Sequence, residues 1–247
     1  MRFKVWRSGK GGKEARYESY DVQTTPGMSV LEALFAIQDE YDDSLAFRYA
    51  CRGAVCGSCA MTINREPRLA CRTQVSESPQ MKSLSLRRFP GLAGSETWNR
   101  DEEILIEPLP NLPIERDLIV DMSRFYDAYK KTRPWLNAEE GQKGFSKASP
   151  QDVAKVEKFA NCILCAACFG ACPVCERDSS YLGPAALAWS YRFYDDVRET
   201  SPAEKIARAA ERDGVPGCEF IYNCVKVCPK DVAPAMAIRK LKDEIKA

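Results

Sequence analysis

The sequence predicts an α+β protein in two parts, with a sheet in the N-terminal half and helices in the C-terminal half. Strand-like runs at Arg2–Arg7 and Arg16–Val22 flank a glycine-rich turn. The C-terminal half instead shows helix caps followed by apolar residues at helical spacing. The 12 cysteines fall on either side of a stretch, positions 72 to 161, that contains none. These observations favour two domains, residues 1–110 and 111–247, each long enough for its own core.

In the first half, the sequence predicts a small mixed sheet crossed by one helix. Ser29 and Glu32 form a capping box, and apolar residues recur at helical spacing after it, so a helix begins there. Further strands are expected at Ala60–Ile63, Arg68–Val75 and Ile104–Glu107.

The second half is predicted to be almost entirely helical. One apolar face is formed by Ile114, Leu118, Met122, Phe125 and Tyr129. Later helices are expected to start at Ser149, Pro184, Ser201 and Pro234. The first of these has Pro150 and Asp152 in its first turn, and Gly214 is expected to end the third. A polar connection at Asn137–Lys147 precedes Ser149.

The composition excludes several classes of function. A formal net charge of +1 gives no field that would attract nucleic acid or an anionic membrane. No apolar stretch approaches the length of a spanning helix, and the first residues lack a signal-peptide core, so we expect a cytoplasmic chain unless a partner carries it elsewhere. The absence of histidine excludes Cys2His2 zinc sites, histidine-ligated haem and histidine acid–base catalysis. In a reducing compartment, 12 cysteines indicate metal binding in preference to disulfides.

The first cysteine group has the spacing of a plant-type ferredoxin. Its members are Cys51, Cys56, Cys59 and Cys71. The spacing C-x4-C-x2-C, with a fourth cysteine twelve residues later, is typical of a [2Fe–2S] cluster. Gly53 and Gly57 allow the loop to adopt positive φ angles and to approach the cluster closely. The alternative is a zinc site, but structural zinc usually pairs two C-x2-C knuckles, and this group contains one.

The second cysteine group has the spacing of a bacterial two-cluster ferredoxin. Its members are Cys162, Cys165, Cys168 and Cys172, followed by Pro173. In the pattern C-x2-C-x2-C-x3-C-P, the fourth cysteine ligates the cluster of the other run. A second run is present downstream, and its members are Cys218, Cys224 and Cys228.

One ligand place in the second run is occupied by Ile221 instead of cysteine. Crosswise ligation assigns a complete [4Fe–4S] set to Cys162, Cys165, Cys168 and Cys228. The other cluster receives only Cys172, Cys218 and Cys224, which favours [3Fe–4S]. The alternative is a fourth iron that carries water or another ligand. Cys175 is left over, and we expect it to be a buried structural thiol.

Taken together, these motifs resemble those of the iron–sulfur subunits of succinate dehydrogenase and quinol:fumarate reductase. The resemblance spans nearly the whole chain and includes the segments Leu69-Ala70-Cys71, Gly183-Pro184-Ala185 and residues 224–230. It implies an N-terminal β-grasp (plant-type) ferredoxin domain followed by an all-α helical ferredoxin domain. The segment Ser76–Asp101 is an insertion relative to many members, and we expect a surface loop there.

The resemblance also implies partners and a location. A flavoprotein subunit would carry FAD and the dicarboxylate site, and a membrane anchor would bind quinone and often haem b. The chain would then lie peripherally on the cytoplasmic face of the membrane. The [2Fe–2S] cluster would face the flavin, [4Fe–4S] would be central and [3Fe–4S] near the quinone. Lys242 matches a family lysine near the quinone; the alternative is a solvated cation at the end of a helix.

The expected function is therefore electron transfer between a flavin and a quinone, with no substrate chemistry on this chain. One alternative is the iron–sulfur subunit of a different flavoenzyme, such as a soluble thiol-linked fumarate reductase. The other, from a different class, is a zinc-stabilised interaction module without a redox role.

Overall fold

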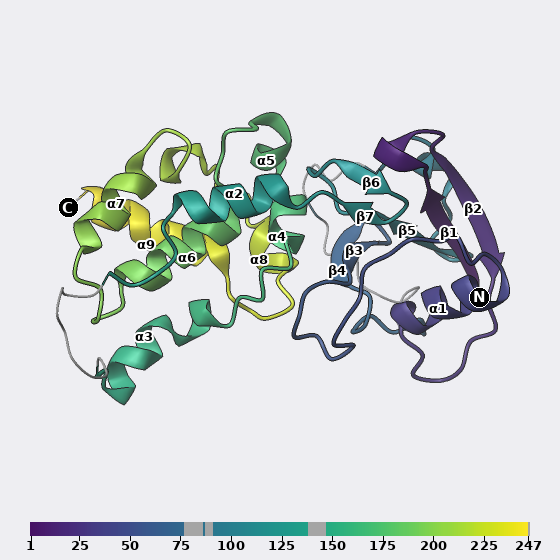
Figure 1. Cartoon of the computed structure of the whole chain (residues 1–247), viewed down its shortest axis with the longest axis horizontal. Helices are drawn as coiled ribbons and strands as arrows, with labels where there is room; N and C mark the ends of the chain where they lie inside the picture. The colour runs from purple at the N-terminus through teal and green to yellow at the C-terminus, as the bar shows by residue number, and fades with distance from the viewer. Residues whose placement is uncertain (77–85, 87–90, 138–146, 247) are drawn as a thin grey trace. The chain divides into compact units, whose positions relative to one another are not determined.

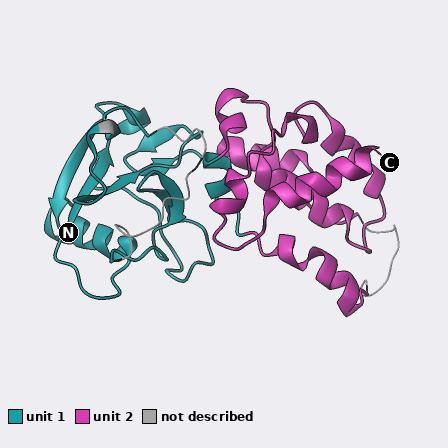
Figure 2. Cartoon of the chain, turned by 180° about the vertical axis from the view of Figure 1, so that it is seen from behind, with its two compact units in different colours: residues 1–122, 163–171 teal, residues 123–162, 172–247 magenta. Residues whose placement is uncertain are grey.

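The computed structural model describes residues 1–76, 86, 91–137 and 147–246 and divides the chain into two compact units (Figure 2). The first unit comprises Met1–Met122 together with Ile163–Ala171, and the second comprises Ser123–Cys162 and Cys172–Ala247. The first unit therefore includes a short cysteine-bearing stretch from much later in the sequence. Within the described residues, no helix has both the length and the apolar character needed to cross a membrane.

The first unit is built on a five-stranded mixed sheet with the order β2-β1-β5-β3-β4 (Figure 1). The strands are β1 (Arg2–Arg7), β2 (Arg16–Asp21), β3 (Ala60–Ile63), β4 (Glu66–Leu69) and β5 (Glu103–Glu107). The two central neighbours β1 and β5 are parallel, and the other pairings are antiparallel. The unit also contains the 3-10 turns η1 (Lys10–Gly12) and η2 (Ser95–Thr97) and the short helix α4 (Ala167–Gly170).

Helix α1 (Val30–Glu40) covers the apolar face of this sheet. The predicted capping box is confirmed, because the Ser29 hydroxyl accepts the Glu32 N–H and the Glu32 carboxylate accepts the Ser29 N–H at 2.7 Å. Leu34 of α1 lies in one hydrophobic core with Phe3 of β1 and Ile106 of β5, and all three are fully buried. Burial of this helix face stabilises the unit by removing apolar surface from water.

The predicted strand Arg68–Val75 is wrong in its limits, since β4 spans Glu66–Leu69. The hairpin turn is only Asn64-Arg65, and both residues have positive φ angles of 49° and 63°, as a type I′ turn requires. The strand ends early because Leu69 C=O accepts the N–H groups of two residues that follow Cys71. Cys71 therefore lies in a turn after the strand.

The predicted helical face from Ile114 is also wrong in its first half. Residues Ile114–Arg116 and Ile119–Val120 form the hairpin β6-β7, and the helix α2 begins only at Ser123. Asp117 adopts a left-handed conformation (φ 46°) between the two strands. Its backbone and carboxylate are held by residues far away in the sequence, and these contacts outweigh the local helical pattern.

The second unit is helical. Its helices are α2 (Ser123–Lys131), α3 (Pro150–Ala160), α5 (Pro173–Arg177), α6 (Pro184–Tyr194), α7 (Pro202–Ala210), α8 (Asn223–Lys226) and α9 (Pro234–Lys246), with a 3-10 turn η3 (Val215–Gly217). Helix α6 lies at the centre and packs against α2, α3, α7 and α9 (Figure 1). It is buried on nearly all sides, which agrees with its apolar sequence.

The predicted helix starts at Ser149, Pro184, Ser201 and Pro234 are confirmed. The expected end at Gly214 is wrong, because α7 stops at Ala210. Gly214 instead forms a turn so close to the helix that an added Cβ would lie 2.2 Å from the carbonyl oxygen of Ala209. Within the predicted loops at 76–101 and 137–147, residues 77–85, 87–90 and 138–146 lie outside the described residues.

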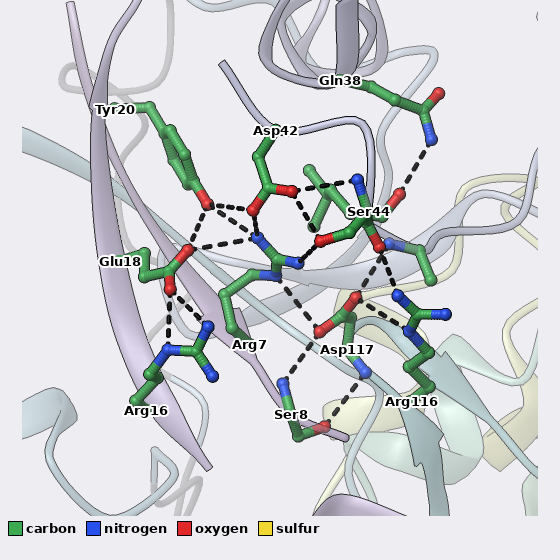
Figure 3. A network of polar contacts seen from close by, with 12 residues as sticks. Arg7, Ser8, Arg16, Glu18, Tyr20, Gln38, Asp42, Ser44, Arg116 and Asp117 are labelled. Atoms are coloured by element: carbon green, nitrogen blue, oxygen red, sulfur yellow. Dashed lines mark hydrogen bonds and ion pairs between the residues drawn. The ribbon is translucent and has the colours of Figure 1, made fainter. Parts of the chain in front are cut away.

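A buried ionic network fixes the β6-β7 hairpin to the sheet of the first unit (Figure 3). The Arg7 side chain is 4% exposed; its guanidinium donates to Asp117 at 3.1 Å, to Glu18 at 3.1 Å, to Tyr20 at 2.8 Å and to Asp42. Burial alone would lower the pKa of Arg7, but the hydrogen bonds to Asp42 and Asp117 outweigh it and raise the pKa. Arg7 therefore stays charged at neutral pH, with carboxylate partners around it.

We expect Asp117→Asn to destabilise the first unit by roughly 3 kcal/mol, because it removes a negative charge that compensates the buried Arg7 guanidinium. The carboxylate also accepts the N–H groups of Ser8 at 2.8 Å and Ala46 at 2.9 Å on its two oxygens, and asparagine has only one accepting oxygen. Denaturant unfolding followed by circular dichroism under anaerobic conditions measures this loss. Asp21→Asn, which breaks an exposed ion pair with Arg2, is the control and should change little. Equal stability of the two variants would contradict the assigned role.

Candidate metal centres

The loop that follows residue 50 directs backbone N–H groups at sulfur. The Cys51 sulfur accepts the N–H groups of Gly53, Val55 and Cys56 at 3.3–3.4 Å. The N–H of Cys51 in turn points at the Cys56 sulfur at 3.5 Å. Amide groups aimed at a sulfur in this way are the hydrogen bonds by which a protein tunes a cluster ligand.

Left-handed residues produce this arrangement. Arg52, Ala54 and Gly57 have positive φ angles of 55°, 57° and 74°. Of the two predicted loop glycines, only Gly57 therefore has the conformation expected, because Gly53 is not among the residues with positive φ. Two residues with side chains adopt the conformation in its place, at a cost of about 1–2 kcal/mol each.

The four cysteines of this group differ in their surroundings. Cys51 and Cys56 are exposed, Cys71 is half-buried and Cys59 is buried. Hydrogen bonds from the Cys51 N–H and from Ser58 lower the pKa of Cys56 to about 6. Burial raises the pKa of Cys59 to about 12, although the Cys71 N–H donates to its sulfur. A bound cation would compensate for this burial, because a coordinated thiol loses its proton outright.

Gly57 brings this loop against the second cysteine group within the first unit. An added Cβ at Gly57 would lie 2.8 Å from the Cβ of Cys165 and 3.0 Å from the carbonyl oxygen of Ile163. The backbone of the first loop and a predicted ligand of another cluster are therefore in direct contact. Only a glycine fits at this point, because of both the φ angle and the lack of space.

The two C-terminal cysteine runs share one backbone conformation. In the first run, Leu164 and Ala166 are left-handed, and α4 starts directly after Ala166. In the second, Phe220 and Tyr222 are left-handed, and α8 starts directly after Tyr222.

This repeat places Ile221 between two left-handed residues, just as Cys165 lies between two in the first run. The structure thus gives Ile221 the backbone position that a ligand has in the other copy. A hydrophobic side chain occupies it.

A pocket in the second unit is lined by Cys172, Cys218 and Cys224, with Ile221 and Tyr181 beside them. Its empty volume is about 340 Å³, part of which is open to solvent. The structure therefore brings together the three sulfurs of the predicted [3Fe–4S] set, and Ile221 lies at the same pocket.

The three pocket sulfurs receive different hydrogen bonds. The Cys175 thiol donates to Cys172 and lowers the pKa of Cys172 to about 7, against the effect of burial. Burial raises the pKa of Cys218, against the opposing effects of the Phe220 N–H and of the Tyr181 hydroxyl. Burial and the neighbouring sulfurs raise the pKa of Cys224 to about 12.

The four predicted [4Fe–4S] ligands differ in how deeply they are buried. Cys168 is buried, and Cys162, Cys165 and Cys228 are half-buried. The Cys228 sulfur accepts the Val232 N–H at 3.3 Å. Among the described residues, no three Cys, Asp or Glu side chains are arranged to hold a single metal ion.

Lys242 lies on α9 with its ammonium 5.0 Å from the centre of the Phe220 ring. Phe220 lines the pocket, and the charge of Lys242 lowers the pKa of Cys218 in part. Lys242 is thus near the three-cysteine pocket and half-exposed.

Sequence reasoning missed Tyr181 and did not find a contact for Cys175. Cys175 is fully buried, as expected, but its thiol is also a donor to a predicted ligand. No spacing rule in the sequence predicts Tyr181, because the residues that line a pocket can come from any element that reaches it.

Cysteine loops with amide groups aimed at sulfur, in the spacings of plant-type and two-cluster ferredoxins, define an iron–sulfur electron carrier. Comparison with known families agrees. Residues 2–127 match a family described as a 2Fe-2S iron-sulfur cluster binding domain, and residues 154–229 match one described as a 4Fe-4S dicluster domain.

Comparison with individual proteins is more specific. The fumarate reductase iron-sulfur subunit of Escherichia coli O6:H1 is 34% identical over 227 residues, 91% of this chain and 84% of that protein. The succinate dehydrogenase iron-sulfur subunit of Coxiella burnetii is 37% identical over 227 residues, 91% of this chain and 87% of that protein. A chain of the Mycobacterium smegmatis Sdh1 complex in the apo form matches with a TM-score of 0.80 and 26% identity, over 99% of this chain and 94% of that one.

The chain belongs to the family of iron–sulfur subunits of succinate dehydrogenase and fumarate reductase. It is an electron-transfer subunit of such an oxidoreductase, and it carries iron–sulfur clusters in both its N-terminal and C-terminal parts. The zinc-stabilised module considered from the sequence is not favoured by these matches.

We expect Gly57→Ala to disturb the [2Fe–2S] loop and the segment around Cys165 together. The methyl group would force a left-handed alanine and a contact of 2.8 Å with Cys165. EPR of the reduced protein and its iron content should show a broadened or partly lost [2Fe–2S] signal. Gly53→Ala is the matched control, because its added Cβ would meet only the Cys51 carbonyl oxygen at 3.7 Å. An unaltered spectrum in Gly57→Ala would argue against this contact.

We expect Ile221→Cys to convert a three-iron cluster to a four-iron one. The new thiolate would stand where the other run has Cys165, and it would supply the fourth ligand. EPR of the oxidised protein should lose the three-iron signal, and iron content should rise by one atom per chain. Ile245→Cys, a half-buried change on α9 outside the pocket, is the control. Persistence of the full three-iron signal in folded Ile221→Cys would contradict the predicted ligand place.

Proposed function

We propose that the chain relays single electrons through three clusters between a flavoprotein and a quinone site. The proposed [2Fe–2S] ligands are Cys51, Cys56, Cys59 and Cys71. The proposed [4Fe–4S] ligands are Cys162, Cys165, Cys168 and Cys228. The proposed [3Fe–4S] ligands are Cys172, Cys218 and Cys224. The clusters supply one-electron carriers, and the protein sets their potentials by hydrogen bonding and burial.

The observation that carries this proposal is the contact of Gly57 with Cys165. It joins the loop of one ligand set to a member of another within a single compact unit. A proposed ligand of one cluster thus lies directly beside the loop that would hold another. Such proximity suits electron transfer and has no purpose in a pair of independent structural metal sites.

The domain organisation we propose follows the ligand sets. Residues 1–110 form a β-grasp ferredoxin domain, and residues 111–247 form a helical ferredoxin domain. The parallel central pair β1-β5 and the single helix α1 packed on the sheet support the first assignment.

Two partners are proposed, one from the exposed residues of the first cysteine loop and one from the names of the relatives. Val55 at the tip of the first loop is 65% exposed, and Cys51 and Cys56 beside it are exposed as well. An apolar, thiol-bearing loop of this kind fits coverage by an FAD-containing subunit. The relatives are named as subunits of fumarate reductase and succinate dehydrogenase, which supports a membrane anchor binding quinone, and in some cases haem b, as the second partner. The chain would then be peripheral, on the cytoplasmic face of the membrane.

Lys242 is proposed to contact the quinone. Its ammonium lies near the pocket of the three sulfurs, over the Phe220 ring, and is half-exposed. A cation at this place could donate a hydrogen bond to a quinone oxygen. The alternative, a cation that merely stabilises the end of α9, predicts no effect on quinone reduction.

The test is purification of the native complex under anaerobic conditions. We expect a brown complex containing FAD and a membrane subunit, with eleven cysteine ligands accounting for nine iron atoms per chain in sets of two, four and three. Potentiometric EPR should resolve three cluster signals, and the complex should oxidise succinate with a quinone. A soluble complex that reduces fumarate with thiols would support the alternative flavoenzyme. Absence of iron and acid-labile sulfide would overturn the proposal.

A further inference from the structure

Helix α4, which contains the proposed [4Fe–4S] ligand Cys168, is bound by a side chain from a distant loop of the first unit. The Asn111 side-chain nitrogen Nδ2 donates to the carbonyl oxygens of Phe169 and Gly170, at 2.9 Å in both cases. These are the last two residues of α4. Because both partners are carbonyl oxygens, only the nitrogen side of an amide fits between them.

The backbone that carries Asn111 is fixed by the sheet. It follows β5 directly, and the Thr62 hydroxyl of β3 donates to the Pro108 carbonyl oxygen at 2.9 Å. Pro108 and Pro110 restrict φ just before Asn111. Asn111 itself is left-handed, with a φ of 65°, a conformation that asparagine adopts more readily than most residues with side chains. The sheet therefore determines where the amide lies.

Helix α4 also packs closely against the same loop. An added Cβ at Gly170 would lie 3.1 Å from Cδ of Pro110 and 3.6 Å from Cδ2 of Leu109. Phe169 is 1% exposed, and buried carbonyl groups need hydrogen-bond partners. A helix of four residues is not stable in isolation, so its position depends on contacts such as these.

A chain of hydrogen bonds leads from Asn111 to the backbone of the ligand. The peptide group whose carbonyl oxygen belongs to Gly170 has the N–H of Ala171, which donates to the Ala167 carbonyl oxygen at 3.0 Å. The peptide group of that Ala167 carbonyl has the N–H of Cys168. Hydrogen bonds in such a chain polarise and strengthen one another. The Asn111 amide is therefore coupled to the backbone of Cys168 through two successive peptide groups.

We propose that Asn111 is a positioning residue for the four-iron cluster, whose amide fixes α4 and so holds Cys168 in place to retain the cluster. The proposal rests on the ligand set proposed above. It assigns a role to a residue outside the cysteine motifs, and that role depends on hydrogen-bond donation. The alternative is an asparagine that only fills space beside α4.

The experiment compares Asn111→Gly and Asn111→Asp with the unmodified chain in the purified complex under anaerobic conditions. Glycine adopts a φ of 65° without strain and removes the amide. Aspartate keeps the shape of asparagine, but its carboxylate cannot donate and would face two carbonyl oxygens.

The measured quantity is the rate at which an iron chelator abolishes the four-iron EPR signal of the reduced complex. A chelator reaches this iron through local opening of the segment that contains α4. Each hydrogen bond corresponds to about a fivefold change in an equilibrium constant, so Asn111→Gly should lose the cluster about twenty-five-fold faster. Asn111→Asp should lose it faster still, because of the added repulsion. A residue that only fills space predicts the opposite order, with Asn111→Asp close to the unmodified complex.

Asn64→Gly is the matched control. Asn64 is also left-handed, with a φ of 49°, and its side-chain oxygen accepts the Leu105 N–H of β5 at 2.9 Å. The control thus removes a side-chain bond to a distant backbone group in the same unit, but that group lies in the sheet and not in α4. It should leave the loss rate of the four-iron cluster unchanged. In the two Asn111 variants, the [2Fe–2S] signal should persist while the four-iron signal is lost.

The proposal is overturned if Asn111→Asp keeps its four-iron cluster as long as the unmodified complex does. Loss of the two-iron and four-iron signals at equal rates in Asn111→Gly would also overturn it, because unfolding of the whole first unit would then explain the result. Should neither complex assemble, Asn111→Ser is the next variant. Its hydroxyl can donate one of the two bonds, so loss should be about fivefold faster, and an unchanged rate would overturn the proposal. If the unmodified complex contains no four-iron cluster, the ligand assignment itself fails, which is a distinct result.

Discussion

The structure around the cysteines depends on one constraint: backbone N–H groups must point at sulfur. A strand or helix already uses its N–H groups internally, so the ligand loops leave regular structure and adopt left-handed turns. Arg52 and Ala54 do this in the first loop, and Leu164 and Ala166 do it in the second. These conformations are unfavourable for residues with side chains. They persist because the sheet and helices on either side of each loop fix its ends, which is the contribution of the two cores to function.

Cysteine spacing and helix capping were readable from the sequence because each depends on residues close together in the chain. The Ser29 capping box and the start at Ser149 are local hydrogen-bond patterns, and the structure confirms both. The equivalence of Ile221 with Cys165 was likewise predicted from spacing alone. The repeated left-handed residues around both positions give that prediction a structural basis. Short-range sequence patterns therefore predicted most helices and strands and the cysteine groups.

The failed prediction of a helix from Ile114 concerns a segment controlled by distant residues. Asp117 interrupts a helical pattern because Ser8 and Ala46, far away in the sequence, donate to its carboxylate. No window around Asp117 contains that information. The same limit applies to Tyr181, which lines one pocket with Cys218 although the two residues are far apart in the sequence. Ligand residues follow a spacing rule, whereas the other residues that line the pocket are brought there by tertiary structure.

The buried thiols would couple cluster binding to the release of protons. Burial raises the pKa of Cys59 and of Cys224 to about 12, so both are protonated at neutral pH in the metal-free protein. Iron can bind these sulfurs only as thiolates, and each must therefore release a proton when a cluster enters. Cys56, whose pKa is lowered to about 6, is exposed and already a thiolate. A bound cluster would place positive charge beside both sulfurs and favour their thiolate forms, most of all at the buried position.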